Sequence, residues 1–72
     1  MPSRVGESKQ LWHPELARWV PCVVWSIDPD NDGSECLEVL YLSGPTWTPV
    51  VAVPATLENE ADTSIWKWRE LQ

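Results

Sequence analysis

The fold of this chain is decided by the stretch RWVPCVVWSI at residues 18–27, which runs into the acidic turn DPDNDG at residues 28–33. A second apolar run, CLEVLYL at residues 36–42, follows at once. Both runs are rich in β-branched and aromatic residues, which are typical of strands. Two strands around an Asp-Gly turn predict a β-hairpin.

Length and charge limit what this chain can be. With 72 residues there is room for one domain with a small core. We expect residues 1–10, which are polar, to form a flexible N-terminal arm, and residues 11–72 to form a single small β-barrel. The net charge of −6, with only five Lys and Arg residues, argues against nucleic-acid binding and against an anionic membrane surface. No apolar run is long enough to span a bilayer, and the polar start is unlike a signal peptide, so we predict a cytoplasmic protein.

Further short strands follow from the rest of the pattern. Residues 11–12 predict a short first strand, and residues 47–54 predict another after a turn at residues 43–46. Residues 65–71 alternate in character, which favours a strand over a terminal helix capped near residues 62–64. Residues 54–57 are compatible with one helical turn. About five short strands with short connections predict an all-β fold, closed into a small barrel because closure removes exposed edges.

The alternation along these strands predicts which side chains fill the barrel. Pro21 indicates an edge position or a bulge in its strand. The expected core consists of Val23, Trp25, Ile27, Leu37, Val39, Tyr41, Val51 and Val53.

The two cysteines are expected to remain reduced in the cytoplasm. In a hairpin centred between Asn31 and Asp32, Cys36 lies opposite Ile27 and Cys22 lies opposite Tyr41. The predicted geometry therefore disfavours a disulfide within the hairpin. Both cysteines are expected to act as small core residues.

Two segments of the chain resemble a known class of barrel. RWVPCVV at residues 18–24 resembles the second strand of SH3-like barrels of the Tudor type, and VVAVPATLE at residues 50–58 resembles their penultimate strand. The same segments are weakly similar to the type II plasmid dihydrofolate reductases, which are tetrameric SH3-like barrels. That resemblance implies a cofactor and folate site at residues 50–53. The Gln and Tyr of the family's Val-Gln-Ile-Tyr stretch are replaced there by Val51 and Val53.

Six tryptophans in a chain without phenylalanine are the strongest functional signal. Each indole has on the order of 200 Å² of surface to bury. A domain of this size is therefore expected to leave two or three of the tryptophans partly exposed. One interpretation places Trp25 and one or two others in the core and the rest over strand edges. A second is an aromatic groove for a proline-rich peptide or a cationic side chain. A third is a subunit interface, because strands that are apolar on both faces need a cover. The candidate ligand-binding residues flank predicted loops: Trp12, Trp19, Trp47 and Trp66.

The acidic turn offers a candidate cation site. Asp28, Asp30 and Asp32 followed by Gly33 match the start of a calcium-binding loop, whose ligands alternate along the chain. The bidentate Glu expected at the twelfth position is replaced by Val39, and Glu38 stands one residue early. A polar hairpin turn explains the same residues without a metal. Calcium is therefore a weak prediction, and no other cofactor is expected.

No catalytic constellation is recognisable in the sequence. The chain lacks a Gly-rich phosphate loop and a nucleophile elbow, and its single His13 and two cysteines do not make a zinc site. We predict a small non-enzymatic interaction module with a Trp-lined surface that binds a protein or peptide and self-associates as a homo-oligomer. One alternative is a ligand-binding or reductase-like oligomer. Another is an acidic mimic of nucleic acid that inhibits a basic partner.

Overall fold

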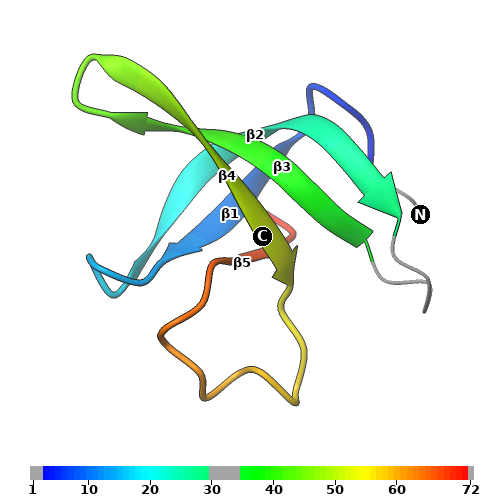
Figure 1. The fold of residues 1–72 in the computed structure, drawn as a ribbon, viewed down its shortest axis with the longest axis vertical. Coiled ribbons are helices and arrows are strands. Elements are labelled where there is room, and N and C mark those ends of the chain that lie inside the picture. Colours follow the sequence, from blue (N-terminus) through cyan, green and yellow to red (C-terminus); the bar gives the residue numbers. More distant parts are fainter. Residues whose placement is uncertain (1–2, 30–34, 72) are drawn as a thin grey trace.

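The computed structural model describes residues 3–29 and 35–71, and these form a barrel of five strands (Figure 1). The strands close in chain order, so that β5 returns to pair with β1. Their bounds are β1 Ser8–His13, β2 Arg18–Pro29, β3 Glu35–Ser43, β4 Thr46–Pro54 and β5 Lys67–Arg69. The all-β barrel fold is confirmed, and its size and closure are compatible with an SH3-like barrel. Within the described residues there is no helix of the length and apolar character that could cross a membrane.

Most predicted strands are present with slightly different ends. The first strand begins at Ser8 rather than at residue 11, so residues 8–10 belong to the barrel and not to an arm. The predicted helical turn at residues 54–57 is wrong, because Pro54 ends β4 and a turn spans residues 57–61. The strand predicted near the C-terminus is confirmed as β5.

A β-bulge at Trp25 explains a one-residue shift in the hairpin register. Cys22 lies opposite Tyr41 as predicted, and Val24 lies opposite Val39. Beyond the bulge Ser26 pairs with Glu38, so Cys36 faces Asp28 instead of Ile27. A bulge sets two residues against one and thereby moves every later pair by one position. The two cysteines are not joined by a disulfide.

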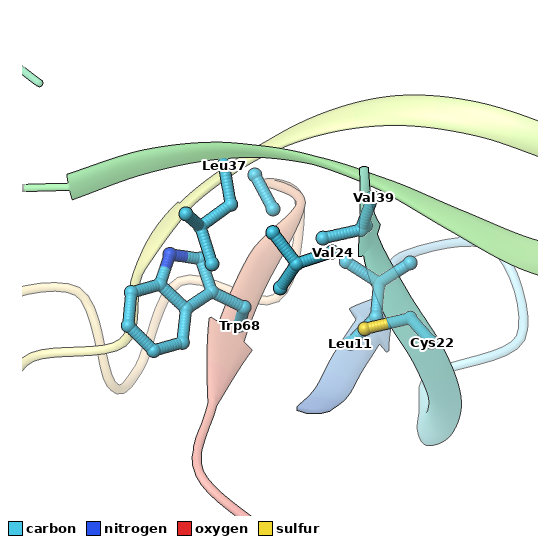
Figure 2. Close-up of a cluster of buried hydrophobic side chains, with 7 residues drawn as sticks. Leu11, Cys22, Val24, Leu37, Val39 and Trp68 are labelled. Atoms are coloured by element: carbon cyan, nitrogen blue, oxygen red, sulfur yellow. The ribbon is translucent and has the colours of Figure 1, made fainter. Parts of the chain in front are cut away.

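The buried core lies on the opposite face of two strands from the predicted one. Its members are Leu11, Cys22, Val24, Leu37, Val39, Ala52 and Trp68, which cluster between the strands (Figure 2). Leu37 and Val39 were predicted correctly, and Ile27 and Tyr41 pack partly buried against the cluster.

The core prediction is wrong for four residues. Val23, Trp25, Val51 and Val53 alternate with the buried Cys22, Val24 and Ala52, and they lie on the outer side of β2 and β4. Strands that are apolar on both faces carry no hydrophobic alternation to say which side points inward.

The β3–β4 hairpin is long and projects away from β1 and β5 (Figure 1). Its loop is Gly44-Pro45, since Ser43 pairs with Thr46. Gly44 has φ of +61°, and glycine at the first central position is typical of a type II′ turn. Pro21 and Pro49 are tolerated because each sits where its strand pairs on one side within the described residues, with Gln10 and Leu40 respectively.

Candidate functional site

Of the four tryptophans predicted to bind ligand, the structure brings two together. Trp12 of β1 and Trp19 of β2 are cross-strand partners on the outer side of the barrel. Their ring centroids are 5.5 Å apart and their planes meet at 68°. Trp47 lies elsewhere, half-exposed on β4, and Trp66 packs at one end of the core.

The pair of indoles forms one wall of a pocket with a volume of about 430 Å³. Its opposite wall is the segment between β4 and β5, seen as the yellow-to-orange loop in Figure 1. The volume falls within the usual range for small-ligand sites, roughly 300–1,000 Å³. The residues that line the pocket are Trp12, Trp19, Ala55, Thr56, Leu57, Glu60, Thr63, Lys67 and Arg69.

Lys67 holds the loop wall in place. Its ammonium group donates to the carbonyl oxygens of Asn59, Glu60 and Asp62 at 2.9, 3.1 and 2.9 Å. Three bonds use all three donors of an ammonium group, which explains how this lysine can be buried. The same nitrogen lies 5.7 Å from the centre of the Trp12 ring. Lys67 is therefore a structural part of the pocket.

Short polar bonds shape the rest of the loop. The Thr56 N–H donates to Asn59 Oδ1 at 2.8 Å, and the Asn59 N–H donates back to the Thr56 hydroxyl at 3.3 Å. This reciprocal pattern is that of a capping box, although no helix follows. Trp12 Nε1 donates to the carbonyl oxygen of Thr63 at 3.1 Å, which ties the loop to β1.

Asp62 stabilises the far end of the loop. Its Oδ1 accepts the Ser64 hydroxyl at 2.6 Å and the Ser64 N–H at 3.0 Å. These two hydrogen bonds, with a smaller contribution from the Lys67 charge, lower the pKa of the Asp62 carboxyl below its usual range. The side chain is therefore ionised at neutral pH and acts as a turn former.

Arg69 supplies the available positive charge of the pocket. Its guanidinium carbon lies 3.9 Å from the centre of the Trp19 ring. Its Nε donates to Gln10 Oε1 at 2.6 Å across the β1–β5 pair. These two contacts fix the guanidinium over the indole.

Trp66 belongs to an aromatic cluster that packs against the core. Its ring centroid lies 4.7 Å from that of the buried His13 and 5.5 Å from that of Tyr41. His13 Nδ1 accepts the Leu16 N–H at 3.2 Å. At the other end of β1, the buried Lys9 pairs with Glu70 at 2.5 Å and with Glu7 at 3.4 Å.

A second surface on the outside of the barrel is almost entirely apolar. We call it the apolar outer face, and it covers the sheet formed by β2, β3 and β4. Cross-strand pairs join its members, as in Leu40 with Pro49 and Leu42 with Trp47. Its exposed side chains are Trp25 at 54%, Leu42 at 57%, Trp47 at 53% and Val51 at 59% of their full accessibility. The face consists of Val23, Trp25, Leu40, Leu42, Trp47, Pro49 and Val51.

One charged side chain interrupts this face. Glu38 on β3 lies opposite Val51, and its Oε1 accepts the Nε1–H of Trp25. The bond orients the Trp25 indole across the neighbouring strand. It also gives the carboxylate one partner within the face.

The calcium prediction falls largely outside the described residues. Asp30 and Asp32 are not described, and of Asp28 only the backbone is, paired with Cys36. Among the residues that are described, no three His, Cys, Asp or Glu side chains are grouped to hold a metal.

Cys22 is a buried core residue, as predicted. Its burial raises the pKa of the thiol to about 11. It is therefore protonated at neutral pH and is a weak nucleophile.

Sequence reasoning missed the two cationic residues of the pocket. Lys67 and Arg69 lie on the face of β5 opposite Trp68, whose side chain is in the core, as alternation along residues 65–71 implies. That alternation did not indicate that residues 55–63 fold back over this face. The signal available in the sequence was the interleaving of Trp and cationic residues in WKWR at residues 66–69.

We compared the chain with family models, with curated proteins and with solved structures, and none of them matches it.

Proposed function

We propose that this protein is a small non-enzymatic interaction module that self-associates through its apolar outer face. The observation that carries the proposal is the cluster of half-exposed Trp25, Leu42, Trp47 and Val51 on adjoining strands. At exposures of 54% and 53%, two indoles alone leave roughly 200 Å² of accessible surface. Contiguous apolar patches of several hundred Å² mark interaction surfaces on soluble proteins.

A second copy of the chain is the partner that this face fits. A chain of net charge −6 repels itself wherever its acidic residues meet. The apolar outer face carries one carboxylate, Glu38, so two copies can join there with little like-charge contact. The area of seven apolar residues suits the centre of an interface in which each partner buries about 800 Å². A two-fold axis through the face would make it self-complementary.

The geometry of β4 favours packing of one face on the other over pairing of strand edges. Residues 46–52 of β4 pair with β3 on one side, and within the described residues their other side has no partner strand. Pro49 interrupts that edge, because proline has no N–H to donate to an added strand.

Self-association is tested by diluting a methyl-labelled sample. The proposal predicts concentration-dependent NMR shifts at the methyl groups of Val23, Leu40 and Val51. The core methyl groups of Val24 and Val39 serve as the control and should move little. Shifts that spread evenly over both sets, or no shifts between about 10 μM and 1 mM, would contradict association through this face.

The resemblance to Tudor-type barrels and the cytoplasmic location are also part of this proposal. A Tudor-type barrel remains a resemblance carried by residues 18–24 and 50–58, and a cytoplasmic setting would keep both cysteines as thiols. The reductase-like alternative predicts NADPH-dependent turnover of folate. The acidic-mimic alternative predicts a basic partner whose binding weakens steeply with salt.

A further inference from the structure

We propose that the pocket between Trp12, Trp19 and Arg69 binds a peptide segment that presents a carboxylate side chain beside a proline ring. The inference concerns a different surface from the apolar outer face, so it stands whether or not the chain self-associates.

The carboxylate preference rests on the terminal N–H groups of Arg69. A guanidinium has five N–H groups in a planar fork. Within the described residues, Nε has Gln10 as its acceptor, and no acceptor is found for the two terminal nitrogens. The Trp19 ring and Gln10 hold the group in place, so its terminal edge is fixed at the pocket wall. A fixed terminal edge suits two parallel bonds to one carboxylate.

Lys67 strengthens the preference without competing for the ligand. Its ammonium has used its donors on the three loop carbonyls, so it offers positive charge but no free N–H. A cationic ligand would meet this charge and that of Arg69, which already covers the Trp19 ring. The pocket is therefore unlike an open aromatic cage for a cation, which leaves its ring faces free.

Glu60 is the opposing group in the pocket. It lines the same cavity and is exposed, so its carboxylate lowers the local positive charge. Asp62 also interacts with the Lys67 charge, but its Oδ1 accepts the Ser64 N–H and hydroxyl groups and it does not line the pocket. Arg69 and Glu60 should then set the charge preference of the pocket in opposite directions.

The proline ring is matched to the Trp12 indole. Trp12 and Trp19 meet at 68°, and since Arg69 lies over the Trp19 ring, Trp12 is the flat apolar surface offered to the ligand. Proline-rich segments bind aromatic walls of this kind because their extended conformation is already formed before binding. Thr63 accepts the Trp12 Nε1–H and keeps that indole from turning away.

The test uses three synthetic peptides that differ in one side chain: acetyl-Pro-Pro-Glu-Pro-amide and its Gln and Lys counterparts. Binding is followed by the indole N–H resonances of Trp12 and Trp19 in the full chain. The Glu peptide should bind about tenfold more tightly than the Gln peptide, as expected for a charge-assisted pair. The Lys peptide should bind more weakly than both.

Two variants distinguish a loss of carboxylate recognition from a general loss of structure. Arg69→Gln should abolish the difference between the Glu and Gln peptides, and its unfolding temperature shows whether the barrel is intact. Glu60→Gln leaves every bond of Arg69 and Lys67 in place and should tighten binding of the Glu peptide severalfold. Equal binding of the three peptides, tighter binding of the Lys peptide, no binding of any of them at millimolar concentration, or no gain in Glu60→Gln would overturn the proposal.

Discussion

The pocket and the apolar outer face both expose tryptophan, but they are built in different ways. In the pocket each indole has a polar or cationic neighbour, as Trp12 has Thr63 and Trp19 has Arg69. On the apolar outer face, Trp25 and Trp47 lie among aliphatic side chains, and Trp25 has Glu38 as its acceptor. Tryptophan content alone therefore does not identify a ligand site. The neighbours decide whether an indole recognises a charged group or supplies apolar area.

The two surfaces also depend on different parts of the fold. The pocket needs the loop at residues 55–66, which is held by polar bonds. The apolar outer face is carried by three paired strands whose inner sides form the core. Changes in the loop should thus affect one surface and leave the other intact.

The largest expected effect is that of Lys67→Met. The change removes the donor for three part-buried carbonyl oxygens, and each hydrogen bond lost costs about 1 kcal/mol. We expect a loss of about 3 kcal/mol in unfolding free energy, measured by urea unfolding. Lys9→Met is the matched control, because Glu70 and Glu7 can return to water when Lys9 is removed. It should cost less, and an equal or larger loss would contradict the role given to Lys67.

A charge placed on the apolar outer face should break self-association and leave the pocket intact. In Val51→Glu the new carboxylate would be buried between two copies beside Glu38. The dissociation constant of the oligomer should therefore rise about a hundredfold, which corresponds to about 2.7 kcal/mol of binding free energy. Leu57→Glu adds the same charge at a loop residue that is 90% exposed. Sedimentation of both variants tests the difference. Equal behaviour of the two would place the interface elsewhere.

Alkaline pH should destabilise the whole barrel and therefore both surfaces together, because it acts on buried groups that they share. The pKa of Cys22 is raised by burial to about 11. The pKa of Lys9 is raised too, since Glu70 and Glu7 outweigh the lowering effect of its burial. A folded pKa above the unfolded one gives stability that is present at lower pH and is lost as pH rises through the folded value.

We therefore expect stability to fall between about pH 9 and pH 11, by about 2 kcal/mol from the thiol. Urea unfolding across this range measures it. Cys22→Ala should flatten the decline, and a decline of unchanged size in that variant would exclude the thiol as its cause.

The smallest expected effect is that of acid on the turn at Asp62 beside the pocket. The pKa of Asp62 is lowered by its bonds to Ser64. Its stabilisation is therefore present above the ordinary aspartate value of 3.8 and is lost as pH falls through the lower folded value. The Trp12 indole N–H resonance should shift in this range in the wild-type chain and not in Asp62→Asn. A shift of the same size in that variant would exclude Asp62 as its cause.

The strands were predictable from sequence, and their inward faces were not. Leu37 and Val39 alternate with Glu38, so the core side of β3 could be read directly. Val23 and Val24 are identical neighbours, as are Val50 and Val51, so the sequence does not show which of each pair points inward. The bulge at Trp25 adds a register shift that no glycine or turn residue in the sequence indicates. The pocket was predictable only as a pair of tryptophans near loops. Its cationic side depends on carbonyl oxygens of the loop at residues 55–66, and every residue type carries a carbonyl.

The solution mass of the wild-type chain, measured by light scattering over a range of concentrations, tests the central claim most directly. We expect an oligomer of at least twice 8.2 kDa, with Trp25 and Trp47 shielded from iodide quenching. A monomer at millimolar concentration with both indoles open to iodide would contradict it.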